Sequence, residues 1–263
     1  MQIIRFRSGN QTYIGQRISD SIAKVIEGDL LGSYRVTATQ KPIEKLLAPI
    51  IPAAILCIGL NYRAHAAESG SEIPHHPVLF IKNPNALNDP GALIELPDNS
   101  TQVDYEAELT IVIGKTARKV KREQAMDYVF GYTCGNDVSA RDWQRDKTMS
   151  GGQWCRAKSF DGFCPLGPCI VTKDEIPNPN NLAIRSILNG RLMQNSNTGD
   201  MIFDVPTLIE SLSSTMTLSP GTVILTGTPP GVGFARKPPV FMKKGDTIRI
   251  EIEKIGALDN AMR

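Results

Sequence analysis

The stretch VDYEAELTIVIG, residues 103–114, alternates in the way that a β-strand packed on a core requires. Side chains two residues apart on a strand point to the same side, so Glu106 and Glu108 share one face. The opposite face is apolar and consists of Tyr105, Ala107, Leu109, Ile111 and Ile113. Two carboxylates this close repel each other unless a cation, a proton or a basic residue lies between them. We therefore expect this strand to present its acids either to solvent or to a functional site.

A third carboxylate follows the next expected strand, Tyr128–Cys134. Asn136 and Asp137 favour the start of a helix, and a short helix is predicted after them. On such a helix Asp137, Arg141 and Gln144, spaced i, i+4 and i+7, would share one face. An acid, a guanidinium and an amide arranged in this way suit a carboxylate substrate beside a metal. The alternative is an exposed helix face with one ion pair.

The ligand types indicate which metal would fit. Glu106, Glu108 and Asp137 offer oxygen, and no cysteine or histidine pair has the spacing of a zinc site. All-oxygen ligation favours a hard cation such as Mg²⁺, Mn²⁺ or Ca²⁺. Mg²⁺ keeps several waters and binds few protein carboxylates, so positions stay open for a substrate. The three acids therefore predict a catalytic Mg²⁺ or Mn²⁺ in preference to a structural ion.

A possible proton carrier lies in GLNYRAHAAE, residues 59–68, directly after the apolar stretch Ile55–Ile58, which is predicted to be a buried strand. His65 and Glu68 are spaced i, i+3, close enough on a helical turn for the carboxylate to orient the imidazole. That arrangement is typical of a general base held by an acid. A surface ion pair is the alternative interpretation.

Composition limits the classes of partner. The chain has 263 residues, a net charge of +2 and 6% aromatic residues, without a basic block, so no nucleic-acid partner is predicted. The longest apolar stretch, near Leu46–Leu60, is interrupted by Pro49 and Pro52 and is too short to span a bilayer. No signal-peptide core follows Met1. Five cysteines without a CxxC pair indicate a reducing compartment. We expect a cytoplasmic protein with no membrane partner, and the mitochondrial matrix stays open.

Glycine and proline divide most of the chain into short strands, which predicts a β-rich α+β fold. The first residues contain strand-like segments Gln2–Arg7 and Thr12–Arg17 and the weakly helical Ser21–Glu27. We predict a small N-terminal domain over residues 1–50 and a catalytic domain over residues 51–263. Within the latter, Asp246–Glu253 alternates as a half-buried strand and Val205–Leu212 is the best amphipathic helix.

Several longer motifs occur in one order along the chain. They are GLNYRAHAAE (59–68), FIKNP (80–84), DYEAEL (104–109), GYTCGNDVSARDWQ (131–144), RAKSFDGFCPLGP (156–168), LNG (188–190) and LTGTPPGVG (225–233). Together they resemble the fumarylacetoacetate hydrolase family, in particular its short members, over roughly residues 50–260.

The resemblance implies a mixed β-sandwich roll, usually a homodimer, with Mg²⁺ or Mn²⁺ at the mouth of the catalytic domain. It implies that Glu106, Glu108 and Asp137 are the metal ligands and that His65 and Glu68 activate water. It also implies that the substrate's carboxylate and keto oxygens are held by Arg141, Gln144, Lys158 and Thr228, with Lys158 also catalytic. Large family members carry a further acidic ligand shortly before the histidine. Here nothing acidic lies between Glu44 and Glu68, as in the short relatives with three carboxylates.

The expected activity is that of a metal-dependent hydrolase, which cleaves a carbon–carbon bond in acylpyruvate-type 1,3-diketo acids through a stabilised enolate. The same enolate also serves a 2-keto acid isomerase or tautomerase, or a decarboxylase. Oxaloacetate tautomerase and 2-hydroxyhepta-2,4-diene-1,7-dioate isomerase are examples of this alternative. A third hypothesis is a non-catalytic binding protein that retains the fold.

Overall fold

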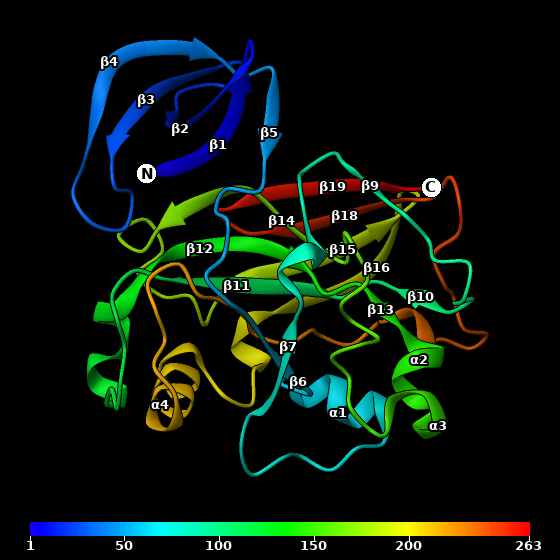
Figure 1. Cartoon of the computed structure of the whole chain (residues 1–263). Coiled ribbons are helices and arrows are strands. Elements are labelled where there is room, and N and C mark those ends of the chain that lie inside the picture. The colour runs from blue at the N-terminus through cyan, green and yellow to red at the C-terminus, as the bar shows by residue number, and fades with distance from the viewer.

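The stretch that contains Glu106 and Glu108 lies at the centre of the molecule (Figure 1). The computed structural model describes all 263 residues. Strand β11 (Ala107–Ile113) runs through the large sheet, and all seven of its residues are buried. The two faces of β11 are therefore both covered, and neither carboxylate faces bulk solvent. The single strand predicted over residues 103–114 is interrupted at Tyr105 and Glu106, which separate β11 from the short β10 (Val103–Asp104).

The large sheet has twelve strands and mixed directions. In it β11 pairs antiparallel with β12 and β17, whereas β17 pairs parallel with β6. Besides β11, its members within residues 51–263 are β6 (Ile55–Gly59), β7 (Val78–Lys82), β8 (Leu87–Asn88), β12 (Val129–Asn136), β14 (Cys164–Thr172) and β17 (Val223–Leu225). The predicted strands at Ile55–Ile58 and Tyr128–Cys134 are thus present as β6 and β12.

A second, five-stranded sheet packs against β11, β12 and β14 (Figure 1). Its strands are β9 (Leu93–Ile94), β15 (Ala183–Leu188), β16 (Arg191–Asn197), β18 (Thr247–Ile252) and β19 (Gly256–Met262). In β18 the isoleucines at 248, 250 and 252 are buried and face the core, as the alternating sequence predicts. Leu109 and Ile111 of β11 share that core with Ile184 of β15. The predicted β-rich sandwich is confirmed.

The N-terminal strands form the far end of the large sheet and appear in blue in Figure 1. They are β1 (Gln2–Ser8), β2 (Gln11–Arg17), β3 (Ile22–Gly28), β4 (Tyr34–Pro42) and β5 (Lys45–Leu47). Only Gln2 and Ile3 of β1 pair with β14, opposite Val171 and Ile170, so the connection along the sheet is short. The domain boundary at residue 50 stays a prediction.

The weak helix predicted over Ser21–Glu27 is wrong, because this segment is strand β3. Val25 pairs with Gly15 of β2, and Ile26 pairs with Val36 of β4. The β-branched residues Ile22, Val25 and Ile26 suit a strand between two neighbours, and this long-range pairing outweighs the local helical tendency.

Four α-helices lie at the edges of the sheets: α1 (Arg63–Ser69), α2 (Arg141–Arg145), α3 (Lys147–Ser150) and α4 (Val205–Thr215). The predicted amphipathic helix is α4, which begins where the Asp204 side chain accepts a hydrogen bond from Thr207 N. Helix α1 ends at Gly70, whose φ of 65° is the left-handed conformation that glycine adopts readily. Short 3₁₀ turns are η1 (Pro84–Ala86), η2 (Arg122–Tyr128), η3 (Thr198–Asp200) and η4 (Gly233–Ala235).

No helix is long and apolar enough to cross a membrane. The five cysteines are all free thiols, and four of them are buried, whereas Cys155 is partly exposed. Burial raises the pKa of the Cys57 and Cys134 thiols well above the ordinary value. These buried thiols therefore stay protonated and belong to the packed interior.

Candidate active site

Three carboxylates meet where β11 and β12 pair. The ligand oxygens of Glu106, Glu108 and Asp137 all lie within 4.8 Å of one another, and all three residues are buried. The register places Ala107 opposite Asn136, so the chain after β12 passes beside Glu106. There Asp137 N donates to Glu106 O at 2.9 Å, and Asn136 Oδ1 accepts from Glu106 N at 3.0 Å. Strand pairing thus brings together acids that are about thirty residues apart in the chain.

Asp137 does not lie on a helix, so the predicted helix face with Arg141 and Gln144 is only partly correct. Ser139 and Ala140 form β13, which pairs with β10, and helix α2 begins only at Arg141. The backbone here is held by this pairing and by hydrogen bonds from Ala140 N to Ala157 O and from Arg141 N to Gln102 O, instead of by helical hydrogen bonds. Arg141 and Gln144 do share a face of α2, where Arg141 Nη1 donates to Gln144 Oε1 at 2.8 Å.

Two buried lysines neutralise part of the acidic charge. Lys158 Nζ lies 2.7 Å from Glu106 Oε2 and 2.6 Å from Asp137 Oδ2. Lys82 Nζ lies 2.6 Å from Asp137 Oδ1 and donates to the carbonyl oxygens of Val138 and Phe163. Burial lowers the pKa of Lys158, but the nearby carboxylates outweigh it, so its pKa is raised. Lys158 therefore keeps its positive charge.

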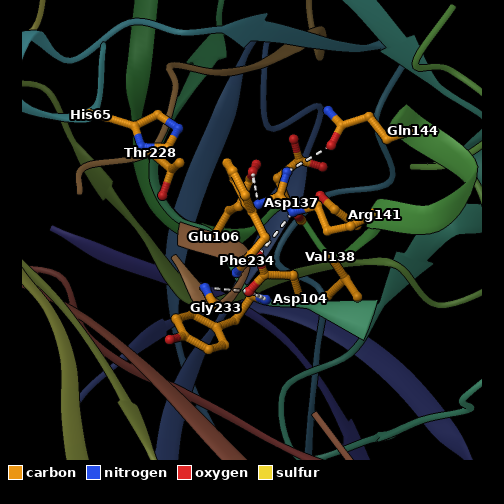
Figure 2. Close-up of polar contacts among 12 residues, drawn as sticks. His65, Asp104, Glu106, Asp137, Val138, Arg141, Gln144, Thr228, Gly233 and Phe234 are labelled. Atoms are coloured by element: carbon orange, nitrogen blue, oxygen red, sulfur yellow. Dashed lines mark hydrogen bonds and ion pairs between the residues drawn. The ribbon is translucent and has the colours of Figure 1, made fainter. Parts of the chain in front are cut away.

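Arg141 is held by acceptors on every side (Figure 2). Its Nε donates to Asp104 Oδ2 at 2.9 Å, its Nη2 to Glu106 Oε1 at 2.6 Å and its Nη1 to Gln144 Oε1. Asp104 also accepts hydrogen bonds from Gly233 N at 2.7 Å and Phe234 N at 3.0 Å. Burial raises the pKa of Asp104, although Arg141 and the Phe234 N–H oppose that shift. Asp104 thus joins α2 to the loop after β17.

Glu108 has no basic side chain in contact with it. Its only hydrogen bond comes from Gly227 N, at 2.7 Å. Gly227 has a φ of 97°, and a Cβ there would lie 2.6 Å from the Asn61 Cβ, so only glycine fits this position. Burial and the charges of Asp137 and Glu106 raise the pKa of Glu108 well above its usual range. Glu108 is the carboxylate whose ionised form lacks a counter-charge.

This donor set fits a hard divalent cation. The three buried carboxylates offer only oxygen ligands. Glu108 lacks a positive partner, and a bound metal ion would supply that positive charge. By contrast, the pKa of Glu106 is lowered: its burial acts against ionisation, but Lys158 and Arg141 outweigh that effect. The site therefore contains a metal-type triad that the protein's own bases neutralise incompletely.

The predicted dyad lies on α1, at the rim of the same cavity. His65 Nδ1 and Glu68 Oε2 are 3.3 Å apart, and both Glu68 oxygens accept from Gly231 N at 3.0 Å. Burial raises the pKa of Glu68, but the hydrogen bonds from His65 and Gly231 outweigh it, so the pKa is lowered. The imidazole is nearly buried and packs edge-on against Phe234. Glu68 therefore fixes one side of the histidine ring and leaves Nε2 without a protein hydrogen bond.

A cavity of about 430 Å³ joins these groups. His65 and Thr228 lie on one side of Glu106 and Asp137 in Figure 2, and Gln144 lies on the other. Gln194 Nε2 donates to Thr228 Oγ1 at 2.8 Å, which leaves the Thr228 hydroxyl hydrogen available to a ligand. Besides the triad, the polar lining consists of His65, Ser69, Ser71, Arg141, Gln144, Arg145, Lys158 and Thr228.

The structure brings together every residue that the sequence singled out for the site, with Glu68 behind His65. Sequence reasoning missed Asp104, Lys82, Gln194 and Arg145. Asp104 had a usable signal, because it continues the two-residue spacing of Glu106 and Glu108. Lys82 lies in the FIKNP motif, but its partner Asp137 is distant in the sequence, and Gln194 meets Thr228 only through the fold.

Comparison with known proteins places the chain in a family. The model of the fumarylacetoacetate hydrolase C-terminal domain matches residues 54–263. The oxaloacetate tautomerase fahd2 of Xenopus laevis, named as mitochondrial, is 53% identical over 216 residues, which are 82% of this chain and 67% of the relative. The chain therefore belongs to the fumarylacetoacetate hydrolase family of enzymes.

Solved structures agree with this assignment over the whole length. The 5-carboxymethyl-2-hydroxymuconate delta-isomerase of Mycobacterium smegmatis is 39% identical, with a TM-score of 0.88, and the match covers 100% of this chain and 99% of that one. A fumarylacetoacetate hydrolase of Exiguobacterium antarcticum is 37% identical, with a TM-score of 0.89 and the same coverage. Both isomerases and hydrolases thus share this fold.

The buried pair of Asp104 and Arg141 leads to a stability prediction. Asp104→Asn should lower the free energy of unfolding by about 3 kcal/mol, because it leaves a buried guanidinium without one of its counter-charges. Urea denaturation of the metal-free protein measures this change. Asp259→Asn is the matched control, since Asp259 pairs with Arg249 at an exposed position and should lose no more than about 1 kcal/mol. Equal effects of the two substitutions would contradict the prediction.

Proposed function

We propose that this chain is a metal-dependent tautomerase or isomerase of 2-keto acids, with oxaloacetate as the leading substrate. The observation that carries the proposal is the buried triad of Glu106, Glu108 and Asp137, with one carboxylate lacking a counter-charge, beside an oriented imidazole in the same cavity. A cation site next to a proton carrier is what enolisation of a keto acid requires. The 53% identical relative named as an oxaloacetate tautomerase supports this choice of substrate.

The carbon–carbon hydrolase that the sequence analysis placed first is not confirmed. It stays a second candidate because the His65–Glu68 pair can activate water as well as carry a proton, and because one structural neighbour is named as a hydrolase. The relative with the higher identity favours the alternative that the sequence analysis placed second. We therefore propose tautomerisation first.

Glu106, Glu108 and Asp137 are the proposed metal ligands, and Mg²⁺ or Mn²⁺ is the proposed cation. When bound, such a cation supplies a Lewis acid for a substrate oxygen that gains negative charge. Lys158 remains protonated between Glu106 and Asp137, so it contributes positive charge and does not act as a base. The Thr228 hydroxyl is free to donate to a substrate oxygen.

His65 is the proposed proton carrier. Conversion of an enol to its keto form removes the proton from the enol oxygen and adds one to the neighbouring carbon, while the electron pair of the double bond forms the new C–H bond. The imidazole accepts and returns a proton without a net change, and Glu68 keeps its ring oriented. Arg141 stabilises this arrangement through Glu106, to which its Nη2 donates a hydrogen bond at 2.6 Å.

Location and assembly stay predictions. The sequence predicts a cytoplasmic protein and the family resemblance implies a homodimer, whereas several relatives are named as mitochondrial proteins. The matrix is therefore a proposal of equal standing.

A proton NMR time course tests the reaction. With Mg²⁺ present, we expect faster conversion of enol-oxaloacetate to its keto form and no cleavage of acetylpyruvate. The same mixture without protein gives the spontaneous rate. Acetate and pyruvate released from acetylpyruvate would instead establish hydrolysis, and CO₂ release from oxaloacetate would establish decarboxylation. If neither substrate changes faster than in the protein-free control, the proposed substrate is wrong.

Glu108→Gln tests the metal assignment. The substitution keeps the shape of the side chain but removes the charge that has no protein partner, so Mg²⁺ affinity should fall at least about tenfold. Isothermal titration calorimetry of the metal-free protein with MgCl₂ measures it. Glu68→Gln, outside the triad, should bind Mg²⁺ like the parent. Unchanged affinity in Glu108→Gln would remove Glu108 from the ligand set.

His65→Ala tests the proton carrier. The variant should bind Mg²⁺ like the parent and tautomerise enol-oxaloacetate at least about a hundredfold more slowly, which is the low end of general acid–base effects. Initial rates followed by ultraviolet absorbance of the enol give the comparison. The exposed His76 provides the control, since His76→Ala should leave the rate unchanged. A parental rate in His65→Ala would exclude His65 from the mechanism.

A further inference from the structure

Arg145 is a cation at the cavity that has neither a hydrogen-bond partner nor an ion-pair partner in the protein. It is the last residue of α2 and lines the same cavity as the triad. Its side chain makes no hydrogen bond and no ion pair. The neighbouring acids are occupied: Asp142 accepts from Ser100 Oγ and Thr101 N, and Asp146 accepts from Thr148 N and Oγ1. The guanidinium of Arg145 is therefore free to bind a ligand.

The other arginine of the cavity does not have this freedom. Arg141 lies one helical turn further in, almost fully buried, and its Nε, Nη1 and Nη2 each donate to a protein acceptor. Three of its five N–H groups are used in this way, so fewer remain for a two-pronged contact with a substrate carboxylate. Arg145 can make that contact without breaking any protein interaction.

Phe234 restrains the direction of Arg145. The Arg145 Cζ lies 5.4 Å from the centre of the Phe234 ring, and the Arg141 Cζ lies 4.5 Å from it. The same ring packs against His65. A guanidinium over an aromatic ring keeps its N–H edge available for an anion. Phe234 thus holds the free cation beside the cavity, with the same ring that packs against His65.

The charge of the lining indicates what the cavity binds. Its acids are Glu106, Glu108 and Asp137, and its bases are Arg141, Arg145 and Lys158, so the charges cancel. The buried groups just behind, Asp104 and Lys82, also cancel each other. A divalent cation at the triad would add positive charge that an anionic substrate can compensate, and Arg145 contributes one further positive charge to the lining.

We propose that Arg145 binds the second carboxylate of the substrate and thereby selects 2-keto dicarboxylates over 2-keto monocarboxylates. This inference rests on the proposed function, in which the keto acid end of the substrate lies at the triad. The second carboxylate then lies toward the cavity mouth, where the C-terminal end of α2 presents Arg145.

Binding of two unreactive probes tests this role separately from turnover. Malate and 2-hydroxybutyrate are four-carbon 2-hydroxy acids that differ in one end, a carboxylate in malate and a methyl group in 2-hydroxybutyrate. Isothermal titration calorimetry with the Mg²⁺-loaded full chain should show malate binding at least about tenfold more tightly, as a charge-assisted hydrogen bond provides. Arg145→Gln should remove this preference by weakening malate alone, and Arg145→Lys should retain part of it.

Lys147→Gln is the matched control, because it removes the same charge from an exposed position two residues away that does not line the cavity. It should leave both affinities unchanged. Equal weakening of both probes in Arg145→Gln, no preference in the parent, or no malate binding to the parent would overturn the assignment. If the preference depends on Arg145 but enol-oxaloacetate is not tautomerised, the proposed function fails and the dicarboxylate site remains.

Discussion

The contact on which the rest of the site depends is the Lys158 ammonium between Glu106 and Asp137. Like charges crowded inside a β-sandwich would destabilise it unless each is paired and hydrogen-bonded. Here each buried base contacts at least two acceptors, and Glu106 receives both Lys158 and Arg141. The exception is Glu108, whose carboxylate accepts a single hydrogen bond, from the backbone N–H of Gly227. The protein thus pairs most of its buried charge and leaves one carboxylate for a cation from outside.

The loop after β17 connects the two halves of the site. Gly231 N donates to Glu68 of the dyad, and the N–H groups two and three residues further along, at Gly233 and Phe234, donate to Asp104. Asp104 in turn holds Arg141. A displacement of this loop would therefore disturb the imidazole and the guanidinium together, although they lie on different helices. The site is one hydrogen-bonded unit, and its precision comes from the backbone of a glycine-rich loop.

Local spacing was sufficient to find the chemistry where one element carries it. Glu106 and Glu108 follow from the two-residue repeat, although Glu106 lies just before β11, and His65 with Glu68 follow from one helical turn. The helix expected to carry Asp137 is absent, because β13 pairs with β10, and Asp137 followed as a ligand from the family resemblance. Ser21–Glu27 was missed as a strand for the same cause. In each case a partner distant in sequence decided the structure, and no local pattern contains that information.

Helix α2 shows how fold and selectivity are divided between residues one turn apart. Arg141 is committed to three protein acceptors, so changing it would disturb Asp104, Glu106 and the loop at once. A residue with that many structural contacts is poorly placed to distinguish one substrate from another. Arg145 makes none of these contacts, so its replacement would alter the charge at the cavity mouth without altering the triad. Selection of the substrate can therefore change while the buried charge cluster and the chemistry it supports stay intact.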